Sequence, residues 1–161
     1  MIVVAPAHPL AGQASVPPGL LAGEPFIARE EGSGARQLMD GLFSDGRAAR
    51  VVMTSGSNET IKQAVMAGMG LALISRHAIG LELHLGLLRI LPVDGFPLMR
   101  SWFVAHRAGM PLLPIHRRLC AFVAERGQAI IDELERSYAA LAPADSAFTA
   151  PTTRSTSAAV L

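Results

Sequence analysis

The chain has 161 residues, of which 50% are hydrophobic and 17% are charged. This length is typical of one domain or two small lobes, and the hydrophobic fraction is enough to bury a core. The formal net charge of +1 argues against a nucleic-acid-binding face, which carries clustered positive charge. A single cysteine, Cys120, excludes an internal disulfide, and we expect it to be a small buried hydrophobic residue.

The sequence shows no recognisable targeting or membrane-spanning segment. The opening residues MIVVA are too short for a signal peptide and have no basic residue before them. The longest apolar stretch, MAGMGLALIS, is well short of the ~20 residues that a membrane-spanning helix needs. These observations favour a cytoplasmic protein without a membrane partner.

Short apolar runs alternate with helix-like segments along the first part of the chain. Apolar and β-branched runs predict strands at residues 2–6, 26–28, 50–55 and 71–75. Helical spacing and caps predict helices at residues 35–43, from Ser57 to Gly68 or Gly70, and over a short segment ending at Gly86. This alternation is typical of an α/β fold with a largely parallel sheet.

The later part of the chain has a simpler pattern. An extended segment is expected at residues 87–93, and a buried strand at 100–107 would place Trp102 in the core. Apolar residues at helical spacing predict one long helix from Pro114 to about Ala140. After Leu141 the sequence is rich in Ala, Ser, Thr and Pro, which predicts disorder.

Two loops, FIAREEGSGAR and VVMTSGSNET, each place Gly and Ser between a predicted strand and the next helix. Helix N-termini carry unpaired N–H groups and partial positive charge, which suit carboxylates and phosphates. Each loop can also be an ordinary helix cap, and Arg36 an ordinary surface salt bridge, so both interpretations stay open. The candidate ligand contacts are Ser33, Gly34 and Arg36 in the first loop and Ser55, Ser57 and Asn58 in the second.

The sequence lacks the spacings that catalysis or metal binding requires. There is no phosphate loop and no GxSxG nucleophile elbow, and none of the five histidines is four residues from another with an acid nearby. Glu30 and Glu31 are expected to solvate their loop, and Glu82 and His84 to lie on the surface. We therefore expect no catalytic residue, no metal and no cofactor.

Several segments occur together in an order that resembles one known family. They are IVVAPAHPLAG, GEPFIAREEGSGARQLMD, ETIKQAVMAGMGLALISRHAIGLELHLGLLRIL and VDGFPLMRSWFVAHR. From residue 2 to about residue 135 the chain resembles the effector-binding domain of LysR-type transcriptional regulators. Within that family, GSGARQ, LISRHAIGLELHLG and GFPLMRSWFV resemble the Calvin-cycle regulators that control the Rubisco operon.

The resemblance implies an α/β fold like that of type II periplasmic binding proteins, in which two lobes enclose a small effector. It implies that residues 8–96 form the complete second lobe. Residues 1–7 and 97–141 would supply the hinge strands and the C-terminal remainder of the first lobe, and residues 142–161 a disordered tail. Ala35 stands where relatives often carry threonine, which removes one hydroxyl donor.

The family's winged helix-turn-helix, linker helix and first half of lobe one have no counterpart in this sequence. The expectation is that the chain is the C-terminal part of a longer regulator, which would contact DNA only through the missing N-terminal domain and would form a homo-oligomer. Trp102, Phe103 and Val104 should then lack packing partners, and the exposed face would favour association.

The resemblance implies that the chain senses a small anionic metabolite, such as a phosphorylated sugar or NADPH, and controls transcription of CO2-fixation genes. Closure of the two lobes would reorient the attached DNA-binding domains, since a ligand acts by favouring one arrangement. An enzyme of the same architecture is the alternative, and a strongly perturbed acid or base in the cleft would distinguish it. A periplasmic solute receptor is a third interpretation, against which the missing signal sequence argues.

Overall fold

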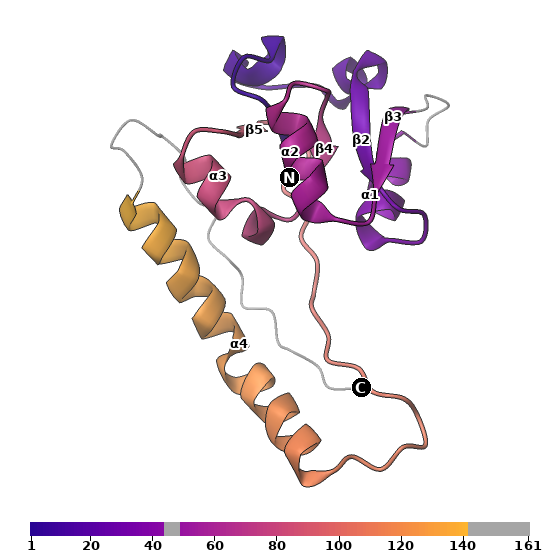
Figure 1. The fold of residues 1–161 in the computed structure, drawn as a ribbon, viewed down its shortest axis with the longest axis vertical. Coiled ribbons are helices and arrows are strands. Elements are labelled where there is room, and N and C mark those ends of the chain that lie inside the picture. Colours follow the sequence, from indigo (N-terminus) through magenta and orange to yellow (C-terminus); the bar gives the residue numbers. More distant parts are fainter. Residues whose placement is uncertain (44–48, 142–161) are drawn as a thin grey trace. The chain divides into compact units, whose positions relative to one another are not determined.

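The computed structural model describes residues 1–43 and 49–141, which fall into two compact units. Unit 1 runs from Met1 to Leu98, and unit 2 begins at Met99 (Figure 1). The predicted cap at Gly46 and the predicted disordered tail at residues 142–161 lie outside the described residues. The assignment of residues to a complete and a partial lobe stays a prediction.

The described residues of unit 1 contain five strands, which are β1 (Ile2–Val4), β2 (Pro25–Arg29), β3 (Arg50–Ser55), β4 (Ala72–Leu73) and β5 (Arg89–Leu91). They form a three-stranded sheet in the order β4-β1-β5 and a separate pair of strands, β2 and β3. β2 and β3 pair in parallel, but β1 is antiparallel to both β4 and β5. The expectation of a largely parallel sheet was therefore wrong for β1, which runs in the direction opposite to its neighbours.

A pair of backbone hydrogen bonds joins the two strand groups. The Leu71 amide donates to the Pro25 carbonyl at 2.8 Å, and the Ile27 amide donates to the Leu71 carbonyl at 2.8 Å. Gly70 makes this approach possible, because a Cβ at that position would overlap the Pro25 carbonyl oxygen. β2 thus lies beside both β3 and the start of β4.

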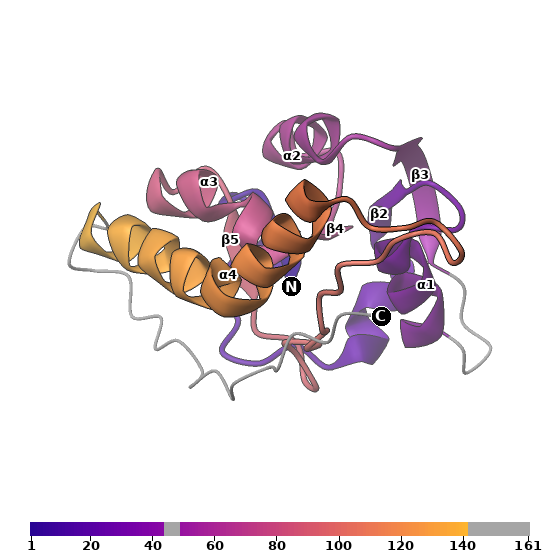
Figure 2. The same cartoon turned by 90° about the horizontal axis from the view of Figure 1, so that it is seen from below.

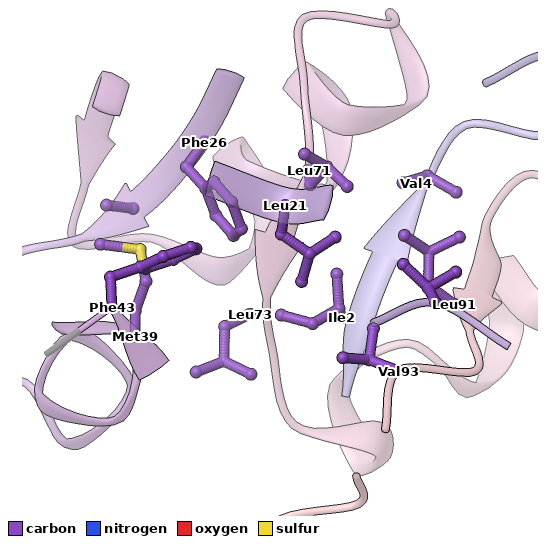
Figure 3. Close-up of a cluster of buried hydrophobic side chains, with 12 residues drawn as sticks. Ile2, Val4, Leu21, Phe26, Met39, Phe43, Leu71, Leu73, Leu91 and Val93 are labelled. Atoms are coloured by element: carbon purple, nitrogen blue, oxygen red, sulfur yellow. The ribbon is translucent and has the colours of Figure 1, made fainter. Parts of the chain in front are cut away.

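Successive residues of the strands pack into two different hydrophobic clusters, as the two-residue period of a strand requires. In β2, Phe26 and Ala28 belong to one cluster and Ile27 to the other. The same alternation sends Ile2 and Val4 of β1 to the first cluster and Val3 to the second. Figure 3 shows the first cluster. In it the Phe26 and Phe43 rings pack edge to face, with their centroids 5.4 Å apart.

Helices cover both faces of the strands and so bury both clusters. α1 (Gly34–Leu42) contributes Met39 to the first cluster, and α2 (Asn58–Met66) contributes Ile61 and Val65 to the second. Figure 2 shows β2 lying between the two helices. As predicted, α1 follows β2 and α2 follows β3 along the chain. Each helix therefore begins near the carboxyl end of its strand.

The segment after β4 corrects one prediction. α3 (Gly80–His84) follows the short 3-10 helix η3 (Arg76–Ala78), and Glu82 of α3 is only 8% exposed instead of lying on the surface. Its carboxylate accepts a hydrogen bond from the Lys62 Nζ of α2 at 2.7 Å. Lys62 also pairs with Glu59 at 2.7 Å, so a three-residue ion network ties α2 to α3. The other 3-10 helices are η1 (Pro9–Gly12) and η2 (Pro18–Gly23).

Unit 2 contains α4 (Pro114–Leu141), the long helix predicted from its apolar spacing. Residues 100–107 do not form the predicted strand, and Val104 makes only an isolated bridge. Trp102 is 71% exposed and Phe103 is 61% exposed, so the interpretation of Trp102 as a core residue was wrong. The expected exposure of this segment is confirmed for Trp102 and Phe103. Cys120 is half-buried, short of the full burial expected.

Candidate functional site

The parallel pairing of β2 and β3 brings the two predicted binding loops together. Arg29, the last residue of β2, lies in register with Ser55, the last residue of β3. Each strand leads through a Gly- and Ser-containing loop into a helix, α1 or α2. The carboxyl ends of adjacent parallel strands are where ligands bind in α/β sheets.

Ser33 and Ser57 cap the two helices, and Ser55 binds the backbone of its own loop. Ser33 Oγ accepts a hydrogen bond from the Arg36 amide at 3.2 Å, and Ser57 Oγ accepts one from the Thr60 amide at 3.3 Å. Ser55 Oγ accepts from the Ser57 amide at 3.2 Å. In all three bonds the hydroxyl oxygen is the acceptor, so each hydroxyl hydrogen can still be donated to an anion. Capping and ligand binding are therefore compatible roles for the same serines.

Arg29 links the two loops, although it was not among the predicted contacts. Its Nη1 donates to Oδ1 of Asn58 at 2.8 Å, across from the β2 loop to the first residue of α2. Its Nε and Nη2 donate to the two carboxylate oxygens of Glu30 at 2.6 and 2.7 Å. The guanidinium thus lies between the loops, where its side chain remains 23% exposed.

The charges of the site are coupled through this arginine. The hydrogen bond from Arg29 lowers the pKa of Glu30, and the same bond raises the pKa of Arg29. Arg36 points its guanidinium to Asp40, one helical turn further along α1, at 2.9 Å. The salt-bridge interpretation of Arg36 is therefore observed, and its role in ligand binding stays a prediction.

The predicted contact residues lie at two kinds of position, at helix N-termini and at a strand end. Ser33 and Gly34 open α1, while Ser57 and Asn58 open α2, so these four lie at the two helix N-termini. Ser55 lies at the end of β3 between the loops. Arg29 was missed because a charged residue at a strand end is usually solvated. Its sequence signal was its place directly after the buried run FIA, which fixes its backbone in the sheet.

The described parts of the chain hold no candidate metal site and no candidate membrane span. Within residues 1–43 and 49–141, no three His, Cys, Asp or Glu side chains are grouped closely enough to hold a metal ion. In those same ranges, no helix has the length and apolar character needed to cross a membrane.

The family follows from comparison with known sequences. The family model described as the LysR substrate binding domain matches residues 1–128 of this chain. The chain therefore belongs to the LysR substrate-binding domain family. This confirms the expected mixed α/β fold of the periplasmic-binding-protein-like kind.

Similar proteins point to one branch of that family. The HTH-type transcriptional regulator CbbR of Rhodospirillum rubrum is 49% identical over 104 residues, which are 64% of this chain and 35% of that protein. The RuBisCO operon transcriptional regulator of Allochromatium vinosum is 44% identical over 115 residues, or 71% of this chain and 38% of that protein. The chain thus spans less than half the length of these relatives.

A solved structure gives the same assignment. The regulatory domain of Synechocystis PCC6803 CcmR, determined in complex with 2-PG, superposes with a TM-score of 0.63 at 35% identity. The match covers 85% of this chain and 61% of that one. The sequence relatives therefore confirm the resemblance to Calvin-cycle regulators, and this structure supports the fold.

Proposed function

We propose that this chain is the effector-sensing part of a transcriptional regulator and that it binds a small anionic metabolite at the ends of β2 and β3. The observation that carries the proposal is that Arg29 links Glu30 of the first loop to Asn58, the first residue of α2. A guanidinium, two hydroxyl groups and two helix dipoles on one side of a site favour a carboxylate or phosphate. Ser33 and Ser57 would donate hydroxyl hydrogens, and Gly34 would allow close backbone approach.

The relatives support a proposal for what the regulator controls and for what it senses. Proteins 49% and 44% identical are a CbbR and a RuBisCO operon regulator, so we infer control of CO2-fixation genes from the cytoplasm. The CcmR domain was solved with 2-PG, a small phosphorylated acid. A ligand of this class, 2-phosphoglycolate, matches the donors of this site better than a large dinucleotide such as NADPH, because the donors are concentrated in two short loops.

The mechanism is a shift between conformations. An effector that contacts both loops stabilises only the arrangement in which both can reach it, and it can shift the equilibrium by no more than that difference in affinity. Such a shift would pass to DNA-binding domains of the complete regulator. An enzymatic role has less support, because the relatives are transcriptional regulators; in addition, Arg29 lowers the pKa of Glu30, which is the opposite of the shift a general acid needs.

Isothermal titration with 2-phosphoglycolate tests the binding site. Arg29→Met should weaken binding by about 30-fold or more, since it removes the central positive charge. Ser33→Ala and Ser57→Ala should each weaken it by about three- to tenfold. Ser33→Thr and Ser57→Thr keep the hydroxyl and serve as controls, and thermal melts separate lost binding from lost caps. Unchanged affinity in Arg29→Met and in both alanine variants would falsify the assignment.

A further inference from the structure

We infer that Glu30 is a built-in competitor for the effector anion, which occupies Arg29 when the site is empty and thereby sets its affinity and charge selectivity. This inference rests on the binding site proposed above. It concerns a residue that contributes no donor to the ligand, and it follows from the geometry of the Arg29 guanidinium.

Glu30 holds the edge of Arg29 that an anion would use. The two carboxylate oxygens face Nε and Nη2 at 2.6 and 2.7 Å, which is the two-pronged arrangement that arginine also makes with phosphates and carboxylates. A phosphorylated acid would seek the same pair of donors. The Glu30 carboxylate therefore binds the same Arg29 donors that the anion of the effector would bind.

Glu30 also lies in the space between the two loops. A Cβ added to Gly56, in the β3–α2 loop, would be 3.7 Å from Glu30 Oε2, so the carboxylate of the first loop reaches the backbone of the second. The Glu30 side chain is nevertheless 45% exposed. It is thus held by Arg29 without being packed in place, and it can move aside.

The number of Arg29 N–H donors that are still unused decides how an anion can bind. Arginine has five N–H donors, and in the described part of the chain three of them donate to Glu30 and Asn58. An effector either displaces Glu30 from Nε and Nη2 or binds at the remaining donors beside a negative carboxylate. Displacement and repulsion both lower the affinity, so neutralising Glu30 raises it in either case.

The opposite role for Glu30 is that of a positioning residue. If the carboxylate mainly holds Arg29 in the correct orientation, its removal weakens effector binding. Glu30→Gln separates the two roles, because the amide oxygen can still accept a hydrogen bond from Arg29 while the charge is gone. Glu31 is the neighbouring acid and is exposed, so Glu31→Gln is a matched control for the change in net charge.

The experiment compares titrations of 2-phosphoglycolate into wild type, Glu30→Gln and Glu31→Gln. Glu30→Gln should tighten binding by about two- to fivefold, the range expected for an exposed ion pair, and Glu31→Gln by less than about 1.5-fold. Glycolate, which lacks the phosphate, should gain less from Glu30→Gln than 2-phosphoglycolate does, because its lower charge is repelled less.

Each result decides between the roles. Weaker binding in Glu30→Gln, or a gain no larger than in Glu31→Gln, overturns the competitor role. Failure of the binding site itself looks different, because Arg29→Met would then bind as tightly as wild type. Glu30→Ala gives a second variant: tighter binding there as well confirms competition, whereas loss of binding in Glu30→Ala alongside no gain in Glu30→Gln identifies a positioning residue.

Discussion

Arg29 Nη1 donates to Oδ1 of Asn58 at 2.8 Å and joins residues 29 positions apart in the sequence. Arg29 ends β2 and Asn58 begins α2, so the bond connects the two loops of the proposed site directly. It also fixes the guanidinium on the side facing α2. The orientation of the central charge therefore depends on a residue of the other loop.

Replacing Asn58 tests this dependence. Asn58→Ala removes the acceptor that orients Arg29 and should weaken 2-phosphoglycolate binding by about three- to fivefold, the net contribution of one ordinary hydrogen bond. Asn58→Asp keeps an acceptor but adds a negative charge, so it should weaken binding further, by about tenfold. Titration calorimetry measures both. Equal affinities for the wild type and Asn58→Asp would show that Asn58 does not face the ligand.

The ion network of Lys62 predicts a stability effect away from the site. The Lys62 side chain is 12% exposed and that of Glu82 is 11% exposed. Lys62→Met leaves the Glu82 carboxylate buried without this partner and should lower the free energy of unfolding by about 2–3 kcal/mol. Adding Glu82→Leu to Lys62→Met should recover at least half of that loss, since no unpaired charge remains. Urea denaturation measures both, and a double variant as unstable as the single one contradicts the explanation.

Gly70 predicts a second effect on stability, because its role is steric. Its φ is +155°, and a Cβ there would overlap the Pro25 carbonyl oxygen, which accepts the hydrogen bond joining β2 to β4. Gly70→Ala should therefore cost about 3 kcal/mol or more. Gly68 has a φ of +77° but open space around it, so Gly68→Ala should cost only about 1 kcal/mol. Thermal unfolding of the two variants should differ clearly, and similar melting temperatures would rule out the close contact.

The pH dependence of stability should report the Arg29–Glu30 pair. The hydrogen bond from Arg29 lowers the pKa of Glu30 from its ordinary value of 4.5. A carboxyl whose pKa is lower in the folded state stabilises the fold above its unfolded value, and this contribution is lost as pH falls through the folded value. Wild type should thus lose more stability than Glu30→Gln between pH of about 5 and 3. Parallel pH profiles, measured by denaturant unfolding, would exclude a folded-state ion pair.

The apolar face of α4 predicts self-association. Leu119 is 58% exposed, and Phe122, three residues further along the same helix, is 51% exposed. Large exposed apolar surfaces favour association. Leu119→Ser combined with Phe122→Ser should shift the sedimentation profile toward the monomer, whereas Glu125→Ser, one turn further on, should not. A wild-type chain that sediments as a monomer at all concentrations would contradict this expectation.

Local patterns were enough to predict most of the elements. An apolar, β-branched run predicted β3 at Arg50–Ser55, although the strand is partly exposed and not buried as expected. Apolar spacing and Pro114 predicted the start of α4, and Ser57 was correctly predicted to cap α2. These features depend on neighbouring residues, so a sequence window contains their causes. The strand predicted at residues 100–107 was wrong because strand formation needs a pairing partner, which no local pattern can supply.

The sequence by itself determined the loops, the caps and, through ordered motifs, the family. Only the tertiary structure decided the direction of β1, the burial of Glu82 and the meeting of Arg29 with Asn58. Each of these depends on contacts between residues far apart along the chain. Hydrogen bonds and ion pairs form between groups that are close in space, whatever their separation in the sequence. The charged centre of the proposed site, Arg29, therefore became visible only after β2 and β3 were paired.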